Sequence, residues 1–316
     1  MQEGETSKAE LASDSVSSSV NPSADGAGVE GDENESESEN DSVSASAAAE
    51  AALDASIDQG ILREMIIAGL CYGRSKAKTH PRMKTRVFAT RNGIELIDVA
   101  QTWQALQAAL EAVKKTVADG QQILLVGTQP SAHESVRTLA EKFGFPYVVN
   151  RWLGGTLTNF KTISRRIEYF KKLKADRAAG LLEKYTKKER LGIDRQIQKM
   201  DEVFRGVEQM GKLPGLVIAV NANLHAVAIH EAHLVGIPVL AIMSSDSDPH
   251  AVEHPVPAND NSTSSIAWLF AKFEEAADEG RKEAAERASA QAAKTTASGG
   301  VPQNAVTAPV EAKPAA

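Results

Sequence analysis

Short runs of apolar residues constrain the fold of this chain more than any other feature of its sequence. Residues 123–126 (Ile-Leu-Leu-Val) form such a run, and residues 146–149, 216–220 and 239–243 form three more. A strand without a polar side is typical of a parallel sheet covered by helices on both faces. Segments with helical spacing at 102–117, 131–143 and 225–235 precede or separate these runs. We therefore expect an α/β fold with right-handed crossovers.

Two local signals predict where the chain turns and where a helix begins. Asn92-Gly93 lies between two short apolar segments, 87–90 and 94–99, and both residue types tolerate positive φ, so the pair predicts a β-hairpin. Ser131 and Glu134 have the S-x-x-E spacing of a capping box and predict the start of the helix that follows the first buried strand.

The stretch at about 159–210 interrupts this alternation of strands and helices. It is rich in Lys, Arg, Glu, Leu and Ile and has no strand signal. Ile163, Ile167 and Phe170 follow a helical period, residues 178–180 (Ala-Ala-Gly) break it, and a second helical pattern follows. These patterns predict an antiparallel helical hairpin inserted between two strands and projecting from the sheet.

The charge of the chain is distributed in three segments. The whole chain has a formal charge of −7, but residues 1–59 contain 15 acidic residues and one basic residue. Residues 60–275 contain 29 basic and 22 acidic residues, and residues 276–316 contain five of each. The first segment, poor in apolar residues, is expected to be a disordered acidic tail. We expect an α/β core at 60–275, and a helix to about residue 290 followed by an Ala-rich disordered tail.

Seven basic residues and no acidic residue lie between residues 72 and 93. Lys and Arg that neutralise phosphates supply the main affinity term in nucleic-acid binding. This basic segment is therefore a candidate backbone-binding surface. Its cations are Arg74, Lys76, Lys78, Arg82, Lys84, Arg86 and Arg91.

Other classes of site have weaker signals. The single cysteine, Cys71, excludes an internal disulfide and favours a reducing intracellular setting, and the N-terminus lacks the pattern of a secretory signal. No apolar run approaches the roughly 18–20 residues that span a bilayer. Common nucleotide, protease and hydrolase motifs are missing, so we expect no enzyme, cofactor or metal. Two alternatives stay open: a phosphate bound near Gly127 to Ser131 and Asn221, and a metal shared by His230 and His233.

One ten-residue stretch resembles the signature of a known family. Residues 150–159 (NRWLGGTLTN) are similar to the signature of the bacterial small-subunit ribosomal protein S-two family. Further similar stretches occur in the same order at 68–69 (AG), 72–73 (YG), 81–84 (PRMK), 91–93 (RNG), 126–128 (VGT), 181–189 (LLEKYTKKE), 210–214 (MGKLP), 228–232 (AIHEA), 236–238 (GIP), 247–249 (SDP) and 259–260 (ND). The resemblance covers about residues 60–275.

The resemblance implies a fold, a role and partners. The fold is a parallel sheet flanked by helices, Rossmann- or flavodoxin-like, with a protruding helical hairpin. The role is structural and cytoplasmic, on the ribosome, with small-subunit rRNA, neighbouring small-subunit proteins and the S-one protein as partners, without a membrane or a homo-oligomer. Besides the basic segment, the rRNA-facing candidates carried over are Asn150, Arg151, Trp152, Asn159, Lys161, Arg165 and Arg166.

The chain departs from the family pattern at several positions. Family members usually have histidines where this chain has Cys71 and Arg74, and a lysine where Gln129 stands. Asn221 and Ser244 occupy positions where acidic residues are common. Arg74 retains a cation with a planar fork, so an RNA contact survives this change more easily than a metal contact does.

A third interpretation, in which the helical hairpin docks a protein, requires an exposed apolar stripe.

Overall fold

The computed structural model describes residues 59–298, with side chains described to residue 289. The predicted acidic tail and the end of the predicted C-terminal tail lie outside these residues. The C-terminal helix α8 spans Thr263–Ser298, several residues further than the sequence pattern suggested. The extension is rich in alanine, the residue with the highest helix propensity. Within the described residues, no helix is both long and apolar enough to cross a bilayer.

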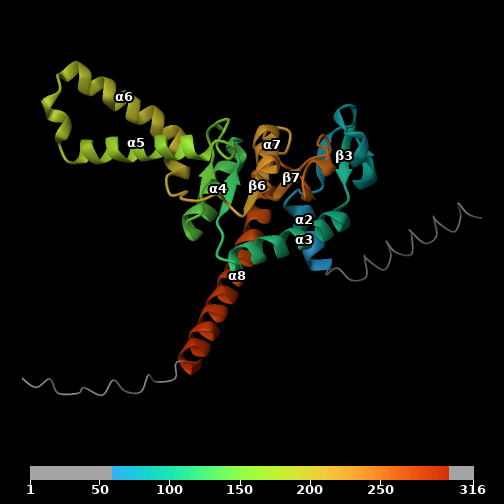
Figure 1. Ribbon diagram of the computed structural model, residues 1–316. Coiled ribbons are helices and arrows are strands. Elements are labelled where there is room, and N and C mark those ends of the chain that lie inside the picture. Colours follow the sequence, from blue (N-terminus) through green and yellow to red (C-terminus); the bar gives the residue numbers. More distant parts are fainter. Residues whose placement is uncertain (1–58, 299–316) are drawn as a thin grey trace, which may run out of the picture. The chain divides into compact units, whose positions relative to one another are not determined.

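A five-stranded parallel sheet forms the centre of the fold (Figure 1). Its strands, in the spatial order β5-β4-β6-β7-β8, are Tyr147–Val148, Ile123–Val126, Leu216–Val220, Val239–Met243 and His254–Pro257. The four predicted apolar runs each contribute one strand, and all neighbouring strands pair in parallel. The α/β fold class predicted from the sequence is therefore confirmed.

The fifth strand, β8, was not predicted from the sequence. It contains Pro255 and Pro257 in a four-residue strand, and it pairs only with β7. Proline cannot donate a ladder hydrogen bond, so it is tolerated on an edge strand and hides that strand from pattern analysis.

Each face of the sheet has its own hydrophobic core. In β4, Ile123 and Leu125 face one core, whereas Leu124 and Val126 face the other. The first core is covered by α3 (Val99–Ala118), α4 (Pro130–Phe143) and α8. The second core is covered by α7 (Ala226–Val235) together with α5 (Phe160–Ala178) and α6 (Lys187–Phe204). Burial on both faces explains why β4, β6 and β7 carry no polar residue.

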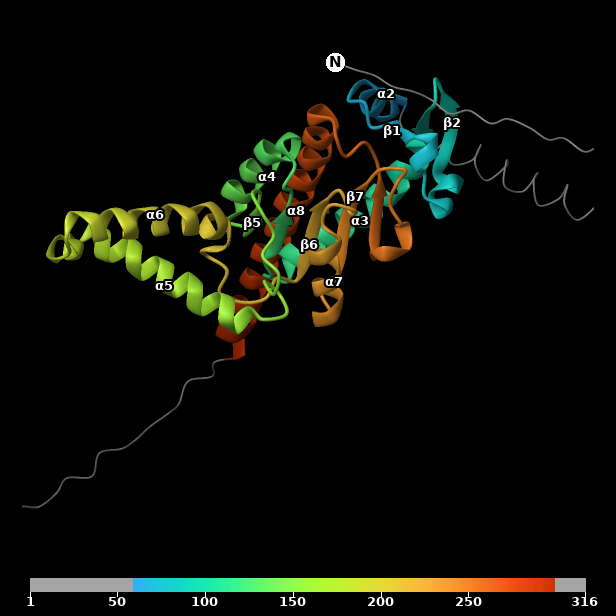
Figure 2. The ribbon, with the colours of Figure 1, turned by 90° about the horizontal axis from the view of Figure 1, so that it is seen from above.

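Two helices, α5 and α6, occupy the stretch between β5 and β6 and lie side by side (Figures 1 and 2). The α5 helix ends at Ala178, and Gly180 adopts a positive φ of 72° in the turn that follows. Thr186 and Glu189 form a complete capping box at the start of α6. The pairs Lys174–Asp201 and Arg177–Asp194 join the two helices at 3.7 and 3.2 Å.

A smaller antiparallel sheet contains the predicted hairpin. Its order is β1-β3-β2, with β1 at Tyr72–Ser75, β2 at Val87–Arg91 and β3 at Ile94–Ile97. Asn92 and Gly93 take positive φ angles of 52° and 76°, as the Asn-Gly pair predicted. A short helix, α2 (Gln59–Ile67), precedes β1, and neither element was predicted.

The capping box predicted at Ser131 is wrong. Gln129 is the N-cap of α4, and no side chain caps this helix. Pro130 occupies the first turn, where its fixed φ starts the helix before Ser131. The Ser131 hydroxyl contacts the Gln129 side chain instead, at 3.5 Å.

The packing of α8 against α3 depends on Gly280. A Cβ atom at Gly280 would lie 2.5 Å from the Lys114 carbonyl oxygen and 3.0 Å from Val117 Cβ. We expect Gly280→Ala to lower the free energy of unfolding by ~1–3 kcal/mol through overpacking, measured by urea denaturation. Gly192→Ala in α6 is the matched control, because nothing lies within 4 Å of its Cβ position. This control should be stabilising by ~0.5–1 kcal/mol, and equal effects of the two variants would contradict the packing argument.

Candidate nucleic-acid interface

The basic segment runs through β1, two short 3-10 helices and β2. The first 3-10 helix, η1, spans Lys76–Lys78, and the second, η2, spans Pro81–Arg86. The backbone N–H of Lys76 donates to the Gly93 carbonyl at 3.0 Å, which ties η1 to the hairpin turn. The His80 N–H donates to the Ser245 carbonyl at 2.9 Å and anchors η2 to the carboxyl edge of the central sheet.

Four cations of this segment are exposed and have no internal partner. Within the described residues, none of their side chains has an ion pair or hydrogen bond. Each therefore keeps its full charge available for an external anion. These residues are Lys76, Lys78, Lys84 and Arg91. Arg86 is half-buried, and burial lowers the pKa of its guanidinium, which still remains charged.

Arg82 is paired with a carboxylate of the protein itself. Its Nη1 atom lies 2.7 Å from Asp248 Oδ2, in the loop that follows β7. The hydrogen bond donated by the His250 N–H, followed by the charge of Arg82, lowers the pKa of Asp248. The Arg82 side chain remains more than half exposed, so it could also reach an external phosphate.

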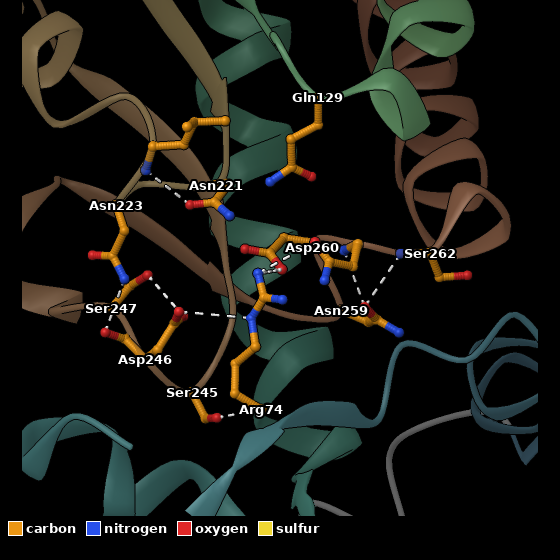
Figure 3. Close-up of polar contacts among 12 residues, drawn as sticks. Arg74, Gln129, Asn221, Asn223, Ser245, Asp246, Ser247, Asn259, Asp260 and Ser262 are labelled. Atoms are coloured by element: carbon orange, nitrogen blue, oxygen red, sulfur yellow. Dashed lines mark hydrogen bonds and ion pairs between the residues drawn. The ribbon is translucent and has the colours of Figure 1, made fainter. Parts of the chain in front are cut away.

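The Arg74 side chain is paired with carboxylates of the protein itself (Figure 3). Its Nη2 atom contacts Asp260 Oδ1 at 2.9 Å and Asn261 Oδ1 at 3.3 Å, and its Nε atom lies 3.6 Å from Asp246 Oδ2. The Arg74 N–H donates to Ser245 Oγ at 2.9 Å. Arg74 therefore joins β1 to the loops that follow β7 and β8, and its charge neutralises carboxylates inside the protein.

The stretch at 150–159 wraps around one buried carboxylate. Glu231 of α7 accepts hydrogen bonds from the Trp152 indole at 3.1 Å and from the N–H groups of Gly155 and Leu157 at 2.8 and 3.1 Å. Burial alone would raise the pKa of Glu231, but these bonds, with those from Thr158, hold it below its ordinary value. The Trp152 indole N–H is therefore bound to a side chain of the protein itself. The sequence analysis did not identify Glu231 as its partner, because Glu231 lies about 80 residues away in the chain.

The other candidates of this stretch remain at the surface. Asn150, Arg151 and Asn159 are exposed. The Asn150 amide donates to the Glu202 carbonyl at the end of α6, and Asn159 precedes α5 without a capping hydrogen bond from its side chain. Arg151 has no side-chain partner within the described residues, so it resembles the free cations of the basic segment.

Two cations on α5 are paired with carboxylates of the protein, and the others have no side-chain partner among the described residues. Lys161, Arg165 and Arg166, in its first half, are exposed and have no side-chain partner among the described residues. Near its end, Lys174 and Arg177 pair with carboxylates of α6 and of the segment that follows it. The opposite side of the helix is buried, with Ile163 and Phe170 at most 7% exposed. Ile163 and Phe170 therefore do not supply the exposed apolar stripe that the protein-docking interpretation requires.

The structure disfavours the phosphate and metal alternatives. The Thr128 N–H, which would point to a phosphate, donates to His225 Nε2 at 3.2 Å. A Cβ atom at Gly127 would lie 2.9 Å from Val136 Cγ2, so this glycine serves helix packing. Among the described residues, no group of three His, Cys, Asp or Glu side chains could hold a metal ion. Burial raises the pKa of the Cys71 thiol, which disfavours a reactive thiolate.

The fold and its surface define an α/β protein that presents unpaired cations on a segment anchored to the central sheet. Residues 65–280 match the family described as Ribosomal protein S2, and the chain belongs to this family. The family is one of structural ribosomal proteins rather than enzymes.

Relatives from several bacteria are similar to this chain over most of its length. The small ribosomal subunit protein uS2 of Corynebacterium diphtheriae is 42% identical over 252 residues, which cover 79% of this chain and 94% of the relative. That of Corynebacterium kroppenstedtii is 42% identical over 232 residues, with 73% and 81% covered. That of Coprothermobacter proteolyticus is 38% identical over 221 residues, with 70% and 82% covered.

Glu231 should be required for the stability of the 150–159 stretch. Glu231→Gln places an amide where at least four donors converge, so some buried N–H groups lose their acceptor. We expect a loss of ~1–3 kcal/mol in the free energy of unfolding, measured by urea denaturation. Glu134→Gln is the control, because Glu134 is exposed on α4 and should change stability by less than ~0.5 kcal/mol. Similar results for both variants would contradict a structural role for Glu231.

Asp260 should make stability depend on pH in the direction opposite to that of most carboxylates. Burial, opposed by Arg74, raises the pKa of Asp260 from 3.8 to about 6. The folded state therefore binds this proton more tightly, and the contribution of Asp260 to stability falls as pH rises from about 4 to about 6, by up to ~3 kcal/mol. Asp260→Asn should remove this part of the pH dependence, measured by urea denaturation across that range. Parallel pH profiles of the two proteins would contradict the raised pKa.

Proposed function

We propose that this chain binds small-subunit rRNA through two groups of unpaired cations. The first group lies in the basic segment and the second at the start of α5. The distinction between free and paired cations carries the proposal, because only a cation without an internal carboxylate gains its full interaction with a phosphate. The free cations of the basic segment are Lys76, Lys78, Lys84 and Arg91, and those at or before the start of α5 are Arg151, Lys161, Arg165 and Arg166.

The sheet supplies the rigidity that such a contact needs. The basic segment is held to the carboxyl edge of the central sheet by Arg74 and by the His80 N–H. A cation on an anchored segment loses less conformational entropy on binding than one on a free loop. In this proposal Arg74 is a positioning residue, and Arg82 contributes a weaker contact because Asp248 already neutralises it.

Protein partners in the small subunit are a further part of the proposal. Family membership favours contacts with neighbouring ribosomal proteins and support for docking of the S-one protein, in a cytoplasmic ribosome. Leu224, Val227 and Leu234, on and beside α7, are each more than half exposed. Exposed apolar side chains on and beside one helix suit a protein contact better than an RNA contact.

The unpaired lysines should determine the salt dependence of rRNA binding. If six to ten phosphates are contacted, affinity falls by about 10³ to 10⁵ between 50 and 200 mM salt. Replacing Lys76, Lys78 and Lys84 with alanine should reduce the slope of log K against log salt by about one per lysine. The measurement is filter binding of the full-length chain to small-subunit rRNA over a salt series.

A second triple variant removes the same charge from lysines with internal partners. Lys114, Lys142 and Lys272 each pair with carboxylates of α8. Replacing these three with alanine should leave the salt slope unchanged. Equal loss of slope in both triple variants would show that net charge, and not the basic segment, controls binding.

A further inference from the structure

The outer face of the three-stranded sheet has a distinct composition. Antiparallel pairing aligns its residues in two rows across β1, β3 and β2. The rows are Tyr72–Leu96–Ala89 and Ser75–Ile94–Arg91. In β3 and β2 the members of the two rows are two residues apart, so they share a face of the sheet. In β1 Tyr72 and Ser75 are three residues apart, and an irregularity between them keeps both in register with β3.

Contacts of the opposite face show which side is exposed. A Cβ atom at Gly73 would lie 3.0 Å from Ser245 Oγ, so this position faces the central sheet. Glu95, which alternates with Ile94 and Leu96, is only 5% exposed. Tyr72 and Ile94, in contrast, are 53% and 44% exposed. The two rows therefore form the solvent face of the small sheet.

Cations border this apolar face. Arg91 ends one row and has no side-chain partner within the described residues. Lys76 follows Ser75 and is tied to the hairpin turn by its hydrogen bond to the Gly93 carbonyl. A purely apolar partner would bury the Arg91 guanidinium without a counter-charge, which is costly. A partner with flat apolar rings and anionic groups can pack its rings on the apolar face and pair its anionic groups with the border cations.

We propose that this face binds one or two unpaired RNA bases by stacking on the Tyr72 ring. Antiparallel sheets with exposed aromatic rings bind single-stranded RNA in this way, because every base has a π-face and the border cations reach its phosphates. Arg91 can contact a phosphate or stack on a second base. The proposal deepens the proposed rRNA binding and rests on it.

A second aromatic residue, Phe88, directly precedes Ala89, which is a member of one of the two rows. Phe88 is 79% exposed and occupies the irregularity in β2 between Val87 and Ala89. A bulge of this kind redirects a side chain out of the regular alternation. Phe88 therefore belongs to neither row, and it is a second candidate for base stacking at the edge of the small sheet.

The test compares affinity with salt slope for the full-length chain. Tyr72→Leu keeps an apolar side chain but removes the ring, and it should weaken binding to small-subunit rRNA and to an unstructured oligoadenylate by about 5- to 150-fold, the range for loss of one stacked base. The salt slope should stay unchanged, because no phosphate contact is removed. Tyr72→Phe retains the ring and should restore the affinity.

Controls separate this inference from the proposed function and from misfolding. Tyr185, 40% exposed in the connection between α5 and α6, is the matched site, and Tyr185→Leu should not change the affinity. Ultraviolet crosslinking of the unmodified chain to oligoadenylate, read by mass spectrometry, should attach a base to Tyr72 or Phe88. Unchanged affinity of Tyr72→Leu, or crosslinks only elsewhere, would overturn the stacking platform while leaving the salt-dependent cations intact. Failure of the wild-type chain to bind rRNA at all would instead overturn the proposed function.

Discussion

Burial of the five-stranded parallel sheet on both faces is the constraint on which the rest of the structure depends. Because the side chains of β4, β6 and β7 are all apolar and buried, no polar group can be presented from either face. Polar chemistry is confined to the carboxyl ends of the strands and to elements added around the sheet. The small sheet, the basic segment and the pair α5 and α6 are such additions, and the carboxyl edge anchors the first two.

Two buried carboxylates hold the added elements in place. Asp260, 1% exposed, receives the Arg74 guanidinium and fixes β1, and Glu231, 6% exposed, gathers the donors of the 150–159 stretch. The two differ in how burial is compensated. Glu231 accepts several hydrogen bonds that favour its ionised form, whereas one oxygen of Asp260 has no partner in the described residues and its pKa rises. Each carboxylate therefore fixes the conformation of a segment that lies far away in the sequence: Asp260 fixes β1, and Glu231 fixes the 150–159 stretch.

Internal pairing sorts the many cations of the chain by role. Lysines that face α8, together with Arg74, are neutralised by carboxylates and stabilise the fold. Lysines and arginines of η1, the hairpin and the first half of α5 have no such partner within the described residues, and these are the cations that we propose contact RNA phosphates. The formal charge of −7 does not reveal this division, because the 15 acidic residues of positions 1–59 outweigh the excess of basic residues at 60–275.

The sequence by itself determined the α/β class, four of the five parallel strands and the Asn92-Gly93 hairpin. These features depend on neighbours within a few residues, which hydrophobic period and turn chemistry reveal. Strand β8 was hidden by its prolines, and Pro130 displaced the helix start predicted at Ser131. Only the tertiary structure decided which cations are free: Arg74 meets Asp260 from 186 residues away, and chain-distant partners of this kind leave no local pattern.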